Sequence, residues 1–316
     1  MLSLLIAVSL VAFGLVTLSP IDPLQANVGQ AALGAMSEEQ KEKLESYWGV
    51  DTPPLERYWN WARDFVRGDM GVSLLYRQSV SDVIGVKLMN SLFLLLFAWL
   101  ISGALGLTLG IVAGVNRGRW PDRVVKAYSL TIASTPAFWL ALLLLMIFAV
   151  WLNLLPVGLS VPIGMEAESV TFLDRLRHAI LPAATLSITG IANIALHTRQ
   201  KVIDVMESEY VLFARARGES TGQIIRRHCL RNILLPAMTL QFASISEIIG
   251  GSVLVEQVFS YPGLGQAAVA AGTGRDVPLL LGITMITALI VFIGNFLADI
   301  LYGVVDPRIR RGGERE

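Results

Sequence analysis

Three acidic residues lie inside long apolar stretches of this sequence, and their position gives them the clearest potential for chemistry. They are Glu247, Glu256 and Asp299. A charge at the centre of a bilayer costs at least a few kcal/mol, so such a residue tends to face water or a protein interior. Glu247 is therefore a candidate for lining a transport pathway; alternatively, it pairs with a nearby serine or backbone group and only holds helices together. Glu256 and Asp299 lie nearer the ends of their stretches, where a structural role is more common.

Polar or helix-interrupting residues also occur in two further apolar stretches. Ser134-Thr135-Pro136 interrupts one of them, and proline removes a backbone hydrogen bond and usually kinks a helix. The kink is either a tolerated structural feature or part of a pathway. Together with Asn193 and Glu247, Ser134 and Pro136 form the predicted set of pathway residues.

Motifs for catalysis or metal binding are missing from the sequence. It contains no Gly-x-x-x-x-Gly-Lys-Ser/Thr loop, no Gly-x-Ser-x-Gly elbow and no His-Glu-x-x-His motif. The glycine-rich residues 263–274 lack the lysine that a phosphate-binding loop needs. The soft metal ligands are scattered without zinc spacing: Cys229, His178, His197 and His228. We expect no catalytic residue, no metal site and no cofactor in this chain, and no internal disulfide.

The composition indicates a protein that spans a membrane several times. Hydrophobic residues make up 54% of the 316 residues and charged residues only 16%, and the mean hydropathy is +0.60. These are too few polar residues to cover a soluble globule of this size. The formal net charge of zero gives no basic field for nucleic acid.

Six apolar stretches are long enough to cross a hydrocarbon core about 30 Å thick. We expect spans within residues 1–21, 88–116, 127–152, 179–198, 234–258 and 277–302. The first could instead be a cleaved signal peptide, but no basic segment precedes it and no small-x-small site ends it, which favours a retained span. The predicted fold is all-α, with a five-helix core in residues 88–302.

Residues 22–87 form the longest polar segment, with ten acidic residues. We expect a folded region outside the membrane. Ser37-Glu38-Glu39-Gln40 resembles a capping box that opens a helix through Tyr47, and Pro53-Pro54 precedes a second helix. The aromatic residues of that second helix are expected to form a small core rather than an interfacial belt: Tyr58, Trp59, Trp61 and Phe65.

The distribution of Lys and Arg predicts the orientation. The loops after spans two and four and residues 303–316 hold fifteen of them, whereas the short loops on the other side hold three. Basic residues in short loops stay in the cytoplasm. Both termini and residues 199–236 should therefore be cytoplasmic, and residues 22–87 extracytoplasmic.

Residues 199–236 form a polar segment between the fourth and fifth expected spans. Seven Lys and Arg occur between Arg199 and Arg231, yet helix-forming residues dominate and apolar positions recur. The segment is therefore expected to be a charged helix pair that docks on another protein.

Five blocks of residues, taken in order, resemble the permease subunits of binding-protein-dependent ATP-binding cassette (ABC) importers, in the dipeptide, oligopeptide and nickel branch. The blocks are Ser134-Thr135-Pro136-x-Phe138-Trp139; His178-x-x-Leu181-Pro182-Ala183; Glu209-Tyr210-Val211-x-x-Ala214-Arg215-Ala216-x-Gly218 with Arg227-His228-x-x-Arg231-Asn232-x-x-Leu235-Pro236; Glu247-x-x-Gly250-Gly251 with Glu256-x-x-Phe259-x-x-Pro262-Gly263-x-Gly265; and Asp306-Pro307-Arg308.

The resemblance implies that residues 199–236 are the EAA loop, a cytoplasmic helix pair that couples the permease to an ATPase subunit. It places the turn between the two helices at Gly218, which agrees with the ability of glycine to accept a positive φ at a helix C-terminus and of Ser220 to cap the next helix. The coupling residues implied are Glu209, Tyr210, Ala214, Arg215, Ala216, Gly218, Arg227 and Pro236. The triplet that gives the loop its name reads Leu212-Phe213-Ala214 here. Pro182 and Pro236 are expected where the flanking helices break or bend.

The resemblance also implies the partners and the location. The partners are a homologous second permease subunit, two ATPase subunits that bind ATP and Mg²⁺, an extracytoplasmic substrate-binding protein and the lipid bilayer of a prokaryotic inner membrane. Transport would proceed by alternating access. Peptide import ranks first and nickel or metal-chelate import second, because no ladder of Cys, His and Met lines the spans. A secondary transporter or a structural assembly subunit are the alternatives of other classes.

Overall fold

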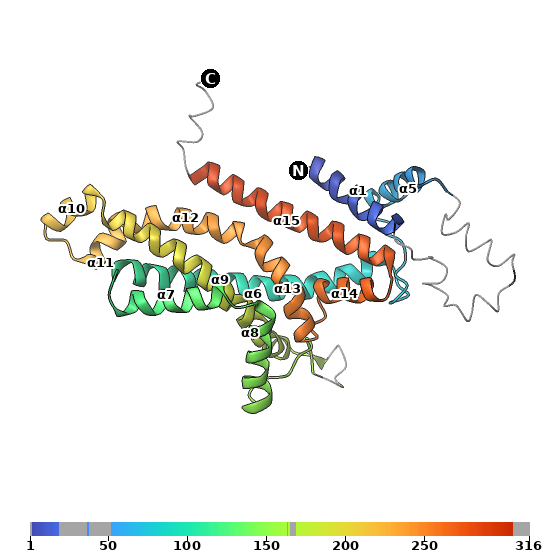
Figure 1. Ribbon diagram of the computed structural model, residues 1–316, viewed down its shortest axis with the longest axis horizontal. Helices are drawn as coiled ribbons and strands as arrows, with labels where there is room; N and C mark the ends of the chain where they lie inside the picture. The colour runs from blue at the N-terminus through green and yellow to red at the C-terminus, as the bar shows by residue number, and fades with distance from the viewer. Residues whose placement is uncertain (1, 19–36, 38–51, 163, 165–168, 306–316) are drawn as a thin grey trace, which may run out of the picture. The chain divides into compact units, whose positions relative to one another are not determined.

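The regular structure of this chain is helical, as expected, in a computed structural model that describes residues 2–18, 37, 52–162, 164 and 169–305 (Figure 1). Contacts divide the chain into two compact units, one of residues 1–91 and 262–290 and the other of residues 92–261 and 291–316. Helices α6 (Val80–Val115) and α15 (Val277–Val305) each contribute to both units. The expected helix that begins at residues 37–40 and the tail at residues 306–316 lie outside the described residues.

In the first unit, the short helix α1 (Leu2–Leu18) packs against α5 (Pro54–Val66) through aromatic side chains. The ring of Phe13 lies 5.4 Å from Tyr58 and 5.7 Å from Trp61, and Ser9 and Tyr58 share a hydrogen bond of 2.8 Å. The aromatic residues of α5 therefore pack together, as predicted. Trp59 is the exception, because its side chain is exposed.

The first unit also has a buried carboxylate, Asp276, directly before α15. Its Oδ2 accepts hydrogen bonds from the Ser73 hydroxyl at 2.5 Å and from the Leu75 backbone N–H at 3.0 Å. Its Oδ1 accepts from the Leu279 N–H at 3.2 Å, so Asp276 caps the first turn of α15. The carboxylate thus joins the loop before α6 to the start of α15. Two effects raise the pKa of Tyr76 in that loop. The larger is desolvation by burial, and the smaller is the negative charge of Asp276.

In the second unit, the long helix α9 (Phe172–Met206) packs against α7 (Trp120–Ala133), α8 (Ala137–Leu144), α12 (Leu230–Ala243) and α13 (Ile245–Val258). Thr171 and Asp174 open α9 with a reciprocal capping box. The expected fourth span, residues 179–198, lies wholly inside α9. The helix continues to Met206, so the first residues of the polar segment extend this helix.

Helix α6 approaches α9 closely through glycines spaced four residues apart. A Cβ added at Gly110 would lie 2.5 Å from the Thr198 Cβ, and one added at Gly114 would lie 2.5 Å from the Val202 Cβ. Such small-xxx-small stripes let membrane helices pack with their backbones close together. At Gly250 of α13, by contrast, an added Cβ would have no neighbouring atom within 4 Å.

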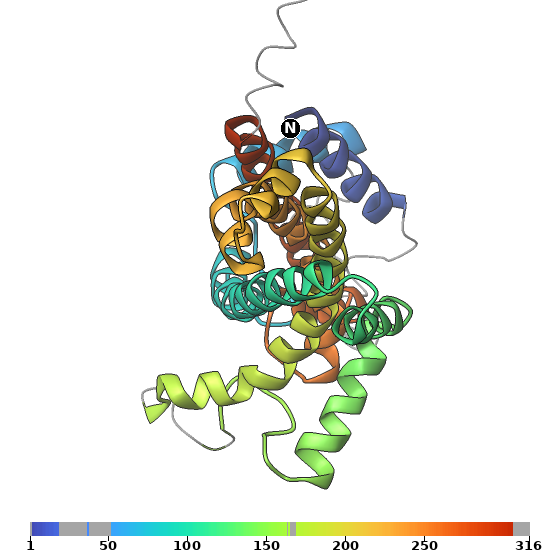
Figure 2. The same ribbon diagram turned by 90° about the vertical axis from the view of Figure 1, so that its left-hand side faces the viewer.

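Two of the expected spans are bent. Helix α7 ends at Ala133, and the path turns by 107° before α8 continues into the π-helix η1 (Leu145–Trp151). Figures 1 and 2 show α8 leaving the direction of α7. The predicted interruption at Ser134-Thr135-Pro136 is therefore confirmed, as a full change of direction. The second bend, of 44°, separates α12 from α13 at Ser244.

The described helices include three that are long and apolar enough to cross a membrane, and up to five if each bent pair counts as one span. All three, α6, α9 and α15, extend beyond one or both of the limits expected for their spans, which were 88–116, 179–198 and 277–302. Helix α1 is apolar but has only 17 residues. The count of six spans stays a prediction.

Candidate functional site

The polar segment after α9 folds into a helix pair with the predicted glycine turn. Helix α10 (Glu209–Ala216) ends where Gly218 takes a φ of +84°. The Gly218 N–H donates to the Arg215 carbonyl at 2.9 Å, and the Glu219 N–H donates to the Ala214 carbonyl at 3.2 Å. These two bonds form a Schellman motif, in which glycine is favoured because it has no Cβ. The turn at Gly218 is confirmed.

The next helix, α11 (Thr221–Ile224), begins with a capping box between Ser220 and Gln223, as predicted for Ser220. It continues through the π-helical turn η3 (Ile225–Cys229) into α12. Neither Pro182 nor Pro236 breaks its helix, so this part of the expectation is wrong, and a bend at either proline stays a prediction. Each lies inside a continuous helix, α9 and α12 respectively, and the change of direction comes at Ser244. Interior prolines are tolerated in membrane helices where neighbouring groups satisfy the freed backbone.

A small apolar core holds this helix pair together. Val211 and Ile224 are fully buried, and Ala214 is 3% exposed. The buried Cys229 thiol contacts the Met206 sulfur at 3.9 Å, and burial raises the pKa of this thiol. Leu107, Ile111 and Val115 of α6 complete the core. Ala214 therefore lies inside the segment, although the resemblance implied a coupling role for it.

The exposed surface of α10 includes three large apolar side chains. Tyr210, Leu212 and Phe213 are 44%, 56% and 67% exposed. The remaining predicted coupling residues also differ in exposure: Glu209, Arg215, Ala216, Gly218 and Arg227 are exposed and Pro236 is half-buried. Large apolar side chains grouped on a charged surface indicate a contact with another protein. Leu212 and Phe213 were not among the predicted coupling residues. Their apolar side chains in a charged segment were the signal available in the sequence.

Ion pairs fix the C-terminal part of α9 to the first turn of α7 and to the turn before α7. The Arg199 guanidinium donates twice to Asp122, once at 2.9 Å, and both side chains are largely buried. Asp122 also accepts from the Gly118 N–H at 2.8 Å. Arg117 pairs with Glu207 in an exposed salt bridge. The two loops that the charge count placed on one side of the membrane therefore meet.

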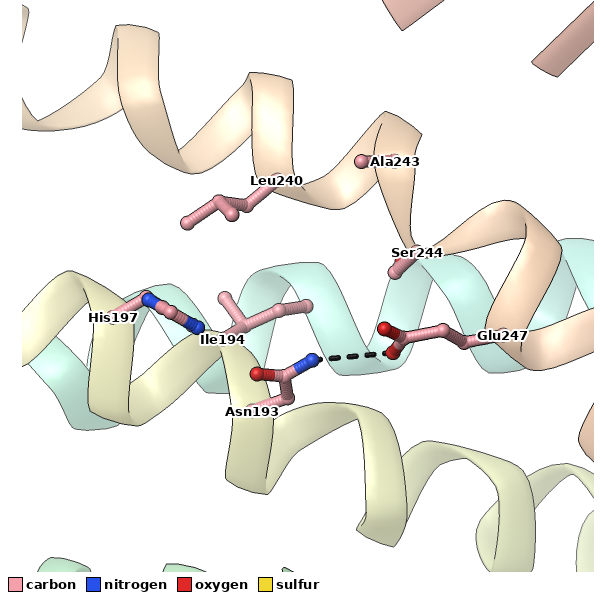
Figure 3. Close-up of a pocket in the computed structure, with 7 residues that line it drawn as sticks. All are labelled: Asn193, Ile194, His197, Leu240, Ala243, Ser244 and Glu247. Carbon is pink, nitrogen blue, oxygen red and sulfur yellow. Dashed lines mark hydrogen bonds between the residues drawn. The ribbon is translucent and has the colours of Figure 1, made fainter. Parts of the chain in front are cut away.

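A second polar site lies between α9, α12 and α13. The Asn193 amide donates to the Glu247 Oε2 at 3.2 Å (Figure 3). The pocket around this pair has a volume of about 120 Å³ and is also lined by Ile194, His197, Leu240, Ala243 and Ser244. Asn193, His197 and Glu247 are exposed in the single chain. Two predicted pathway residues, Asn193 and Glu247, are thus in contact.

The wall of this pocket is held by hydrogen bonds between α12 and α6. The Ser244 hydroxyl donates to the Gln241 carbonyl at 2.8 Å, and the Trp99 indole N–H donates to the same carbonyl at 2.8 Å. The Gln241 amide in turn donates to the Trp99 carbonyl at 2.5 Å. Trp99 of α6 therefore holds the residues next to the bend at Ser244. The bend places Glu247 opposite Asn193.

The other two predicted pathway residues, Ser134 and Pro136, do not line this pocket. The Ser134 hydroxyl donates to the Leu130 carbonyl of its own helix at 3.1 Å. His197 and Ser244 were missed by the sequence prediction. His197 follows Asn193 by four residues on α9, which places both on one helix face, so the helical spacing could have found it.

Comparison with known proteins gives one consistent family. Residues 106–311 match the family described as "Binding-protein-dependent transport system inner membrane component". The chain is 34% identical to the oligopeptide transport system permease protein AppB of Bacillus subtilis (strain 168), over 97% of this chain and 95% of that protein. It is 34% identical to the di/tripeptide transport system permease protein DppB of Pseudomonas aeruginosa (strain UCBPP-PA14), over 96% of this chain and 94% of that protein.

A third relative is the glutathione transport system permease protein GsiC of Escherichia coli O6:H1, which is 33% identical over 97% of this chain and 94% of that protein. The family match covers more than half of the chain, and each relative covers almost all of it. The chain belongs to the family of inner membrane components of binding-protein-dependent transport systems.

Proposed function

We propose that this chain is the membrane-spanning subunit of an ATP-driven importer that takes up di- and oligopeptides. The observation that carries the proposal is the helix pair after α9, with its Schellman turn at Gly218 and its exposed apolar residues Leu212 and Phe213. An exposed apolar face on a charged loop needs a partner surface. The names of the three relatives support peptides over a metal chelate as the substrate.

The partner of the helix pair would be one of two ATPase subunits, which bind ATP and Mg²⁺. Tyr210, Leu212 and Phe213 would fill an apolar cleft on that subunit, with Glu209, Arg215 and Arg227 at the polar rim. Ala214 and Gly218 would act indirectly, because one fills the core of the pair and the other sets its turn.

Helix α9 offers a route from the ATPase to the membrane interior. Its C-terminal residues Val202, Val205 and Met206 belong to the core of the helix pair, and Asn193 of the polar pocket lies about 20 Å before Met206 along the same unbroken helix. Movement of the helix pair would therefore move Asn193 relative to Glu247. In an alternating-access cycle, two homologous permease subunits would open their shared path to one side at a time.

The orientation proposed from the positive charges puts both termini and the helix pair in the cytoplasm. Residues 22–87 would then face outward, where they can receive an extracytoplasmic binding protein that delivers the peptide. Most of the substrate specificity would reside in that protein.

Reconstitution tests this function. The chain, a homologous permease, both ATPase subunits and the binding protein would be placed in proteoliposomes, and ATP-dependent accumulation of labelled di- to pentapeptides would be measured. We expect uptake that requires all five components. Uptake that persists without ATPase subunits, driven by an ion gradient, would contradict the proposal in favour of a secondary transporter.

A further inference from the structure

The pocket between α9, α12 and α13 presents hydrogen-bond acceptors and one negative charge. Glu247 uses its Oε2 to accept from Asn193, which leaves its Oε1 available. The Asn193 amide donates in that bond, so its carbonyl oxygen remains an acceptor, and it points away from Glu247 in Figure 3. The Ser244 hydroxyl donates to its own helix and can still accept. None of the seven residues lining the pocket is Lys or Arg.

The position of these groups makes contact with lipid unfavourable. Asn193 and Glu247 lie within helices that qualify as membrane spans, and both are exposed in the single chain. A carboxylate that faces hydrocarbon costs several kcal/mol, so it faces water or a polar group in the working protein. Within the described part of the chain, Glu247 forms no salt bridge. His197 is the other ionisable residue that lines the pocket, and no salt bridge joins it to Glu247. A cation from outside the chain can therefore pair with the carboxylate.

The size of the pocket limits what that cation can be. A volume of about 120 Å³ has room for an ammonium group with the carbon atoms next to it, and is too small to enclose a whole peptide. An alkylammonium has three N–H donors and no acceptor, which complements a carboxylate flanked by a carbonyl and a hydroxyl. Ile194 and Leu240 also line the pocket, and their apolar side chains can pack against the aliphatic carbons next to such a group.

We infer that this pocket binds the ammonium group of a peptide in transit, with Glu247 as the charged partner and Asn193 and Ser244 as neutral acceptors. The inference rests on the proposed peptide import and adds which part of the peptide this chain recognises. An ammonium group can come from the amino terminus or from a lysine side chain. Both fit the pocket, and the experiment below separates them.

A reporter thiol beside Glu247 tests the site without depending on uptake. Cys229 is the one cysteine of the sequence and is buried, so Cys229→Ala with Ala243→Cys leaves a single thiol on the pocket wall. In the assembled complex, this thiol is modified by a cationic reagent, trimethylammonioethyl methanethiosulfonate, or by an anionic one, sulfonatoethyl methanethiosulfonate. Mass spectrometry of the segment that carries residue 243 measures the two rates. A carboxylate about 6 Å away should favour the cationic reagent about tenfold.

Variants make this test specific. In Glu247→Gln, the ratio of the cationic to the anionic rate should fall close to one. In Glu247→Asp, the ratio should stay high, because the charge is kept. Glu207→Gln lies outside the pocket and should leave the ratio unchanged. Size-exclusion chromatography of each complex confirms assembly. If the ratio is unchanged in Glu247→Gln, the inference is overturned and the proposed peptide import is unaffected. Failure of peptide import in proteoliposomes would not alter this ratio.

The second arm uses peptides as protectants of the same thiol. Trialanine should slow modification more than N-acetyl-trialanine does, and the difference should vanish in Glu247→Gln. An N-acetylated Ala-Lys-Ala that protects as well as trialanine identifies the lysine side chain as a second source of the ammonium group. Equal protection by trialanine and its acetylated form, or protection by neither, overturns the inference.

Discussion

The Arg199 guanidinium donates two hydrogen bonds to the Asp122 carboxylate and so ties the first turn of α7 to α9, close to the helix pair. Only 14% of the Arg199 side chain and 4% of the Asp122 side chain are exposed. Removal of one member of a buried pair leaves the other charge uncompensated, which costs about 3–5 kcal/mol. We expect Arg199→Ala to lower the thermal stability of the purified complex strongly.

The exposed Arg117–Glu207 pair is the matched control for this measurement, because its side chains are 58% and 65% exposed. Surface pairs contribute about 0–1 kcal/mol, so Arg117→Ala should change the melting temperature little. Joint replacement of Asp122 and Arg199 by residues of similar volume should recover part of the loss. Equal effects of Arg199→Ala and Arg117→Ala would contradict a buried role for Arg199.

The turn at Gly218 gives a test of coupling. Proline fixes φ near −65° and has no N–H, whereas Gly218 has a φ of +84° and donates to Arg215. Gly218→Pro should leave membrane insertion intact and abolish substrate-stimulated ATPase activity. Gly222, which has open space around it and no positive φ, provides the control Gly222→Ala. Unchanged stimulation in Gly218→Pro would refute a coupling role for this turn.

The thiol of Cys229 should react slowly in the folded protein. It is fully buried, and burial raises its pKa, although Arg215 opposes the shift. Because the thiolate is the reactive form, a raised pKa means that the modification rate keeps rising to a higher pH than for a free cysteine. Alkylation by iodoacetamide between pH 7 and 10, before and after unfolding in detergent, measures this. A native rate equal to the unfolded rate would show that the core around Met206 is open.

The Asp276 carboxylate should stabilise the first unit through three hydrogen bonds. Asp276→Ala removes the cap of α15 and leaves the Ser73 hydroxyl and the Leu75 N–H without their acceptor, which should cost about 2–4 kcal/mol. Hydrogen exchange at Leu75 and Leu279 should become faster. The exposed Asp82 offers the control Asp82→Asn, with little expected effect. Unaltered exchange at both amides would refute the proposed clamp.

The glycine stripe of α6 should tolerate no larger side chain. A Cβ at Gly110 would meet Thr198, as well as the Ala195 carbonyl oxygen at 2.8 Å. Gly110→Val should therefore prevent α6 from packing on α9 and reduce the yield of assembled complex. Gly250→Ala adds a methyl group where no atom lies within 4 Å, so its yield should match the unaltered chain. Similar yields for Gly110→Val and the unaltered chain would contradict the close approach.

Local chemistry explains what the sequence could predict. Gly218 and Ser220 have turn and cap roles that depend on a few neighbouring residues. The family resemblance placed the turn at Gly218, and the types of both residues agreed with it. The interruption at Ser134-Thr135-Pro136 follows from the missing N–H of proline. The helical class followed from the long apolar stretches.

Tertiary contacts explain what the sequence could not predict. The burial of Ala214 depends on Leu107 and Val115, about a hundred residues earlier in the chain. The 44° bend falls at Ser244 and not at Pro236, because helices in a membrane protein accommodate an interior proline when neighbours satisfy the backbone. The contact between Asn193 and Glu247 depends on that bend. Helical spacing places His197 on the same face of α9 as Asn193, but only the contact with α12 shows that this face lines a pocket.

The core of the helix pair has a consequence for inhibitor design. α10 and α11 have eight and four residues, which is too short for isolated helices to persist in water. Leu107, Ile111 and Val115 come from α6 and complete their core. A synthetic peptide that copies residues 199–236 would lack this support and would compete poorly for the ATPase. A useful mimic would need a covalent brace in place of α6.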